Sequence, residues 1–241
     1  MDWMKMQFLR DIKNSNWVWL SHPLSSSTPA YGDGDGFIVE SIRSIDSGDS
    51  CNTVHLSFSN HLGSHVDSPR HFLLNGKTVD DYNIKEWIFN KPWLIDIPSE
   101  EGEIIGLNRF EKALGECHDA DLLLIRTGFA AHRGSKKYWS SSPSFHPELA
   151  SYLQNRLKSL IAIGLDTISL TSYLHRELGR EAHRAFLNRD IRIFEDLALE
   201  QSIQGNEIRL VIALPLVFEK ADGAPCSIIA LLANPSINDQ T

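Results

Sequence analysis

Residues Asn60 to Phe72 read N-H-L-G-S-H-V-D-S-P-R-H-F. Four side chains in this stretch are imidazoles or carboxylates, and all four occupy odd positions: His61, His65, Asp67 and His71. In an extended segment, residues two positions apart share a face. Gly63 and Pro69 argue against one continuous helix, because glycine and proline both weaken helices. The stretch therefore predicts an extended or gently turned segment that presents these groups on one side.

This combination of side chains is typical of a divalent metal site. Imidazole nitrogens and carboxylate oxygens are zinc ligands, and the two oxygens of Asp67 can bridge two ions. His71 also suits proton transfer, because the pKa of an unperturbed imidazole lies near neutrality. Other interpretations stay open here: the four groups cap turns, or His71 is a further ligand or a surface residue.

The composition is that of an ordinary globular protein. The chain has 241 residues, of which 42% are apolar and 22% charged. Its 23 Lys and Arg against 31 Asp and Glu give a net charge of −8, so the basic surface that binds nucleic acid is not expected. The sequence indicates no membrane span and no signal peptide. Three scattered cysteines suggest neither a disulfide framework nor a thiolate metal cluster, and we expect a soluble, cytoplasmic protein.

Short β-branched runs alternate with segments of helical periodicity along the chain. The runs that predict strands are Val18–Leu20, Phe37–Ile45, Thr53–Ser59, Trp93–Ile97, Leu122–Arg126, Ile161–Leu165, Ile191–Phe194, Arg209–Leu216 and Ser227–Leu232. Helices are expected at Leu107–Leu114, Pro147–Leu160 and Arg176–Asn188. The first half has the period-two pattern of antiparallel strands, whereas the second half alternates strand and helix. We therefore expect a single mixed α/β domain over residues 1–241.

Other motifs give less support to a function. The sequence has no G-x-S-x-G elbow and no phosphate-binding G-x-x-x-x-G-K-[ST] loop. Asp33 and Asp35 fit the first ligand positions of a calcium-binding EF-hand, but Ser44 stands where its final Glu is required. Arg126, at a strand end, pairs with a carboxylate or contacts an acidic substrate. Asp166 either orients a ligand histidine or caps a turn.

The stretch from His61 to His71 resembles the signature H-x-G-[TS]-H-x-D-x-P-x-H of the cyclase family of metal-dependent hydrolases, which includes bacterial kynurenine formamidases and isatin hydrolases. The resemblance covers roughly residues 18 to 232. It continues through Ser21-His22-Pro23-Leu24, Thr28-Pro29-Ala30-Tyr31, Leu124-Ile125-Arg126-Thr127-Gly128 and Ile163-Gly164-Leu165-Asp166-Thr167-Ile168-Ser169. It implies the fold described as a swivelling β/β/α domain, in a homodimer or homotetramer.

The resemblance also implies which residues form the site. His61, His65 and Asp67 would bind metal, and His71 would be the proton donor and acceptor. A helical histidine and a glutamate twelve positions later complete the family's second metal site, and here His183 and Glu195 have that spacing. Asp67 would then bridge two divalent ions, zinc or alternatively manganese. Without the resemblance, His183 and Glu195 would be unremarkable.

The activity implied is hydrolysis of a carbon–nitrogen bond in a small aromatic amide. An arylformamidase acting on N-formylkynurenine, in tryptophan catabolism, would use a metal-bound hydroxide with His71 as proton shuttle. Tyr31 would line the substrate pocket, at a position where formamidases commonly carry Trp. The alternatives are a hydrolase of cyclic amides such as isatin and a member of the fold that binds metal or ligand without turnover.

Overall fold

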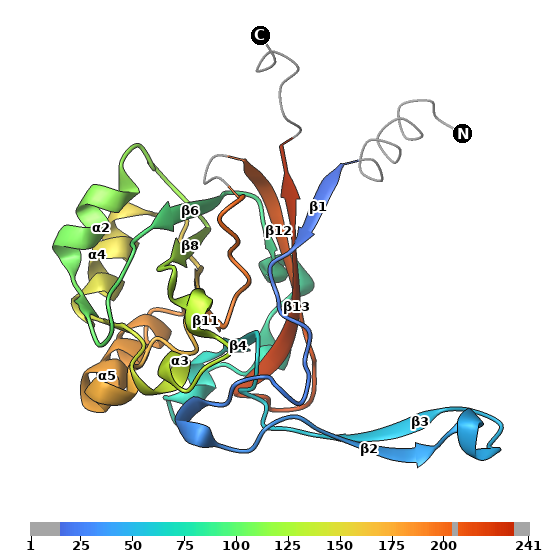
Figure 1. Cartoon of the computed structure of the whole chain (residues 1–241). Helices are drawn as coiled ribbons and strands as arrows, with labels where there is room; N and C mark the ends of the chain where they lie inside the picture. Colours follow the sequence, from blue (N-terminus) through green and yellow to red (C-terminus); the bar gives the residue numbers. More distant parts are fainter. Residues whose placement is uncertain (1–14, 204–206, 234–241) are drawn as a thin grey trace, which may run out of the picture.

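A nine-stranded mixed sheet organises the chain (Figure 1). The computed structural model describes residues 15–203 and 207–233. The order of strands across the sheet is β5 (Ile88–Phe89), β12 (Ile208–Pro215), β13 (Gly223–Leu232), β4 (His65–Asp67), β11 (Arg192–Glu195), β10 (Ala162–Leu165), β8 (Leu122–Arg126) and β6 (Pro92–Asp96), and β1 (Asn16–Trp19) also pairs with β13. β12 contacts β6 as well, so the sheet curls almost into a barrel.

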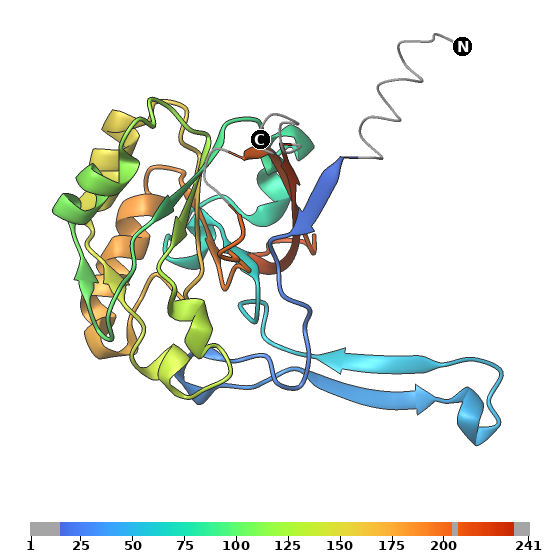
Figure 2. The same ribbon diagram turned by 45° about the horizontal axis from the view of Figure 1, so that its top comes forward.

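Strands β6, β8, β10 and β11 form the parallel part of the sheet. Every residue of β8, β10 and β11 is buried, as expected for parallel strands that are covered on both faces. Helices α2 (Leu107–Leu114), α4 (Glu148–Arg156) and α5 (Arg176–Leu187) lie on one side of this part in both views (Figures 1 and 2). An apolar core fills the space between the strands and these helices.

The short strand β4 joins the parallel part to the antiparallel part. It runs antiparallel to both of its neighbours, β11 and β13. In this register His65 lies opposite Glu195, and Asp67 lies opposite Gly223 on the other side. Because side chains on paired residues of neighbouring strands point to the same face, the register brings His65 and Glu195 together.

A hairpin projects from the body of the protein (Figures 1 and 2). Its strands are β2 (Ile38–Arg43) and β3 (Thr53–Ser57), and every residue in both strands is exposed. Shorter elements complete the fold: β7 (Ile104–Ile105) pairs in parallel with β9 (Ser144–Phe145), and α3 (Lys137–Ser140) precedes β9. No helix in the described part of the chain is long and apolar enough to cross a membrane.

The structure confirms the expected mixed α/β sheet. The first half is not purely antiparallel, because β6 pairs in parallel with β8, and the second half ends in the antiparallel pair of β12 and β13 with no helix between them. The helix at Leu107–Leu114 has the predicted bounds. The helix predicted over Pro147–Leu160 ends at Arg156, because the backbone of Leu157 is extended, although its side chain stays buried. Strand β4 was expected only as an extended segment. All three of its residues are buried, although their alternation of polar, apolar and polar side chains is typical of a strand with one exposed face.

Candidate metal centre and active site

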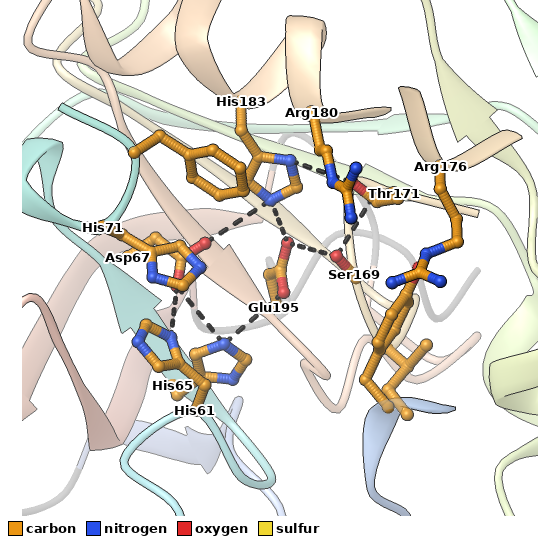
Figure 3. A pocket seen from close by; sticks show the side chains of 13 residues that line it. His61, His65, Asp67, His71, Ser169, Thr171, Arg176, Arg180, His183 and Glu195 are labelled. Atoms are coloured by element: carbon orange, nitrogen blue, oxygen red, sulfur yellow. Dashed lines mark hydrogen bonds and ion pairs between the residues drawn. The ribbon is translucent and has the colours of Figure 1, made fainter. Parts of the chain in front are cut away.

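Side chains from four separate segments meet at β4 (Figure 3). His65 and Asp67 come from β4 itself, and Glu195 ends the neighbouring strand β11. His61 lies in the loop that precedes β4, and His183 lies on the buried face of α5. The odd-numbered positions predicted to share a face therefore do so, and two distant segments add an imidazole and a carboxylate.

The Asp67 carboxylate is the centre of the cluster. Its Oδ1 lies 2.8 Å from Nδ1 of His61 and 3.4 Å from Nε2 of His65. Its Oδ2 lies 3.5 Å from Nε2 of His183. The side chain is only 1% exposed, so the imidazoles take the place of water around the charge.

Glu195 is the second carboxylate of the cluster and contacts His65 and His183. Its Oε1 is 3.2 Å from Nε2 of His183, and its Oε2 is 3.4 Å from Nε2 of His65. Oε1 also accepts hydrogen bonds from the backbone N–H of Leu170 (2.7 Å) and the hydroxyl of Ser169 (3.1 Å). These two donors fix the orientation of the carboxylate toward the histidines.

Backbone carbonyls orient two of the imidazoles. Nδ1 of His65 lies 2.8 Å from the carbonyl oxygen of Gly63, and Nδ1 of His183 lies 2.8 Å from that of Gly179. A carbonyl oxygen only accepts, so Nδ1 carries the proton in both rings. Nε2 of each ring is therefore directed at the Asp67 and Glu195 carboxylates. Metal-ligating histidines are commonly held in this way.

The donor atoms form two groups that share Asp67: His61 with His65 and Asp67, and Asp67 with His183 and Glu195. Within each group all donor atoms lie within 4.8 Å of one another. Imidazole and carboxylate donors without cysteine suit zinc and manganese. The residues present therefore fit a divalent metal centre around Asp67.

Hydrogen bonds to the buried carboxylates shift the pKa of two histidines of the cluster. Burial opposes the charged form of His183, but hydrogen bonds to Asp67 and Glu195 outweigh it and raise its pKa to about 10. Burial is likewise outweighed at His61, where hydrogen bonds to Asp222 and Asp67 raise the pKa to about 10. At neutral pH a divalent ion would have to displace these protons, since a metal ligand needs its lone pair.

His71 lies beside the cluster, outside the two groups that share Asp67. Its ring stacks on that of His61 with centroids 3.9 Å apart, and its Nδ1 is 3.1 Å from Oδ2 of Asp222. Burial lowers the pKa of His71, which favours the neutral imidazole. His61, His71 and Asp222 also form a third group of close donor atoms, so the geometry is compatible with a proton shuttle and with a further ligand.

The cluster forms one wall of a pocket with a volume of about 240 Å³. Tyr31, Phe72 and Ile168 supply its apolar walls, which places Tyr31 in the lining of the pocket beside the cluster. Arg176 and Arg180 of α5 also line the pocket. This is room for a small molecule next to the candidate metal ligands.

Arg126 and Asp166 lie away from this pocket, and both have structural partners. Arg126 is 3% exposed and pairs with Asp96 through Nε (2.6 Å) and Nη2 (2.9 Å). Asp166 accepts hydrogen bonds from the backbone N–H groups of Thr127 and Gly128, each at 2.8 Å. Arg126 therefore pairs with a carboxylate, and Asp166 caps a turn.

Three charged residues of the site are not predicted from the sequence: Asp222, Arg176 and Arg180. Asp222 lies 151 positions from His71, and no local pattern links the two. The arginines could have been found, because Arg176, Arg180 and His183 recur at spacings of four and three, which places them on one face of a helix.

The chain is similar to a family model and to curated proteins over much of its length. A model of the Cyclase family, described as "Putative cyclase", matches residues 18–172. Kynurenine formamidase from Bacillus thuringiensis subsp. konkukian is 30% identical over 214 residues, which cover 89% of this chain and 96% of that protein. Kynurenine formamidase from Bacillus anthracis is 29% identical with the same coverage.

Solved structures of isatin hydrolases share the fold. Isatin hydrolase A from Labrenzia aggregata, bound to benzyl benzoate, has a TM-score of 0.81 at 21% identity, covering 96% of this chain and 100% of that chain. Isatin hydrolase A from Ralstonia solanacearum has a TM-score of 0.78 at 18% identity, covering 96% of this chain and 98% of that chain.

Substitution of Gly223 by Ala should weaken metal binding by about tenfold or more. A Cβ at this position would lie 2.3 Å from Cε1 of His61 and 2.8 Å from the carbonyl oxygen of Val66 on β4. The imidazole therefore has to move. The matched control is Gly134→Ala, where a Cβ meets no atom within 4 Å. Zinc titration of both folded variants measures the effect, and equal affinities would show that the position of His61 does not matter.

Zinc affinity should keep rising with pH through neutrality. An unperturbed histidine has lost its proton by about pH 7. His61 and His183 have a pKa of about 10, so protons still compete with the metal for these two side chains above pH 7. Competition with a chelator of known affinity, from about pH 6 to about pH 8, tests this. A plateau above about pH 7 would contradict the pairing of these histidines with the buried carboxylates.

Proposed function

The chain belongs to the cyclase family, and we propose that it is a metal-dependent amidohydrolase that cleaves a carbon–nitrogen bond of a small aromatic amide, as an arylformamidase does. The observation that carries this proposal is the buried cluster around Asp67 at the wall of a small pocket. A kynurenine formamidase that is 30% identical over nearly the full length of both chains supports the choice of substrate class.

His61, His65 and Asp67 would hold one ion, and Asp67, His183 and Glu195 the second. Zinc is the first candidate and manganese the second. When bound, such ions lower the pKa of a coordinated water and polarise a carbonyl group.

His71 moves the proton in this proposal. Because burial lowers its pKa, the imidazole is neutral at physiological pH and can accept a proton from the attacking water. It then returns the proton to the leaving nitrogen. The Asp222 carboxylate, 3.1 Å from Nδ1, accepts the hydrogen bond that fixes this ring. Tyr31, Phe72 and Ile168 hold the aromatic part of the substrate against the pocket wall.

A cyclic amide is the second candidate substrate. The isatin hydrolases share the fold of this chain, but their identity to it is 21% or lower in the two structures compared, so they argue for the fold and not for the substrate. A lactam ring opens without losing a fragment, whereas an aryl formamide releases formate. The products of the reaction therefore distinguish the two.

The proposal predicts that His71→Ala keeps its metal and loses activity. Wild-type protein loaded with zinc or manganese should hydrolyse N-formylkynurenine and stop after chelation. Loss of a general acid–base should lower the rate of the variant by about 10²- to 10⁴-fold. Formate release and metal content by plasma mass spectrometry are measured on the same samples. Loss of metal would make His71 a ligand, and isatin opening without formamide hydrolysis would select the second candidate.

We further propose that the protein works as a homo-oligomer that is joined through the projecting hairpin. Cross-strand pairing puts Val39 opposite Leu56 and Ser41 opposite Val54, so three exposed aliphatic side chains share one face. An isolated two-stranded hairpin is only marginally stable in water. Burial of this apolar face against a second copy would stabilise the hairpin and remove its side chains from water.

Substitution of Val39 and Leu56 together by Lys should lower the mass of the particle in solution. Charges on this face would oppose burial at an interface between copies. Glu40→Lys, on the opposite face of the hairpin, is the control and should leave the mass unchanged. Sedimentation equilibrium measures all three proteins. A wild-type monomer at micromolar concentration would contradict the proposed oligomer.

A further inference from the structure

One face of α5 carries both a candidate metal ligand and two cations. Arg176, Arg180 and His183 are spaced by four and three residues and line the same pocket (Figure 3). At 1.5 Å per residue, the backbone of Arg180 lies about 4.5 Å from that of His183 along the helix axis, and the backbone of Arg176 lies about 10.5 Å from it. The helix thus places the candidate metal cluster at one end of the pocket and positive charge at the other.

The Arg176 guanidinium has no anionic partner within the described part of the chain. Its contact is with the face of the Tyr173 ring, 5.3 Å from the centroid. Arg180 pairs through Nη1 with Glu177, whose side chain is 80% exposed. A guanidinium offers five N–H donors, so most of those on this pair are unused by protein acceptors.

The acids that line the pocket do not compensate these charges. They are Asp67 and Glu195, and both are already engaged by histidines. The aromatic wall contains one more unused donor, because the buried hydroxyl oxygen of Tyr31 has no hydrogen-bond partner among the described residues. Burial raises the pKa of Tyr31 to about 12, so its proton stays in place. Buried polar atoms without a partner are uncommon and call for an explanation.

We propose that the substrate is an anionic amide, with a carboxylate that Arg176 and Arg180 bind while the scissile bond lies at the Asp67 cluster. This inference rests on the proposed function and names its substrate class. A carboxylate accepts two parallel N–H bonds from a guanidinium, so it supplies both the charge and the geometry that the arginines lack. A neutral amide would leave both cations without an acceptor.

Two matched probes test the charge of the substrate: 2-formamidobenzoate, which is an anion, and 2-formamidobenzamide, which has nearly the same shape and is neutral. Charge-assisted hydrogen bonds predict that wild-type enzyme prefers the anion by about 10- to 100-fold in kcat/KM, mainly through KM. The Arg176→Gln/Arg180→Gln double variant should lose most of this preference. Arg184→Gln, one turn further along α5 and outside the pocket lining, should keep it.

A preference that survives in the double variant, or is absent from wild type, would overturn the inference. A loss in kcat for both probes alike would also overturn it, because the arginines would then act at the reacting carbonyl.

A binding measurement separates this inference from the proposed function. Calorimetry on chelator-treated protein compares 2-aminobenzoate with 2-aminobenzamide, so no metal ion competes for the carboxylate and no turnover is needed. We expect wild type to bind the anion more tightly, and the double variant to lose the difference. If neither formamide is hydrolysed but this difference is found, the amidohydrolase proposal fails and the anion site stands. Equal binding of the two ligands by wild type would refute the anion site.

Discussion

The Asp67 carboxylate is buried to 1% exposure, and the rest of the site is arranged around that charge. An isolated buried carboxylate would be very costly, and it persists only where cations or hydrogen-bond donors surround it. Here three imidazoles do so, and they come from a loop, a strand and a helix. These histidines are also the groups that would hold a divalent ion beside the carboxylate.

The register of the short strand β4 brings the groups that surround Asp67 together. β4 has the antiparallel partners β11 and β13, and the pairing of His65 with Glu195 fixes the distance between the two ends of the cluster. A slip by one residue would turn His65 and Asp67 to the other face of the sheet. Gly223 on β13 leaves the space that the His61 ring fills. The chemistry of the site and the topology of the sheet therefore depend on the same few backbone contacts.

The local part of this arrangement could be predicted from the sequence, and the long-range part could not. The odd-position pattern from His61 to His71 correctly indicated a shared face, because strand geometry is local. His183 and Glu195 were reached only through a family resemblance, since nothing local distinguishes them. Asp222 was missed because only the folded chain brings it to His71. The sequence left two roles open for Arg126, and its burial against Asp96 decides between them.

The most direct test of the account is an anomalous diffraction map of crystals loaded with zinc, recorded at the zinc edge. The account predicts two peaks about 3.5–4 Å apart, one on each side of the Asp67 carboxylate, with His61 and His65 on the first and His183 and Glu195 on the second. A single peak away from Asp67, or none at saturating zinc, would contradict the claim that this buried carboxylate exists to hold a pair of metal ions.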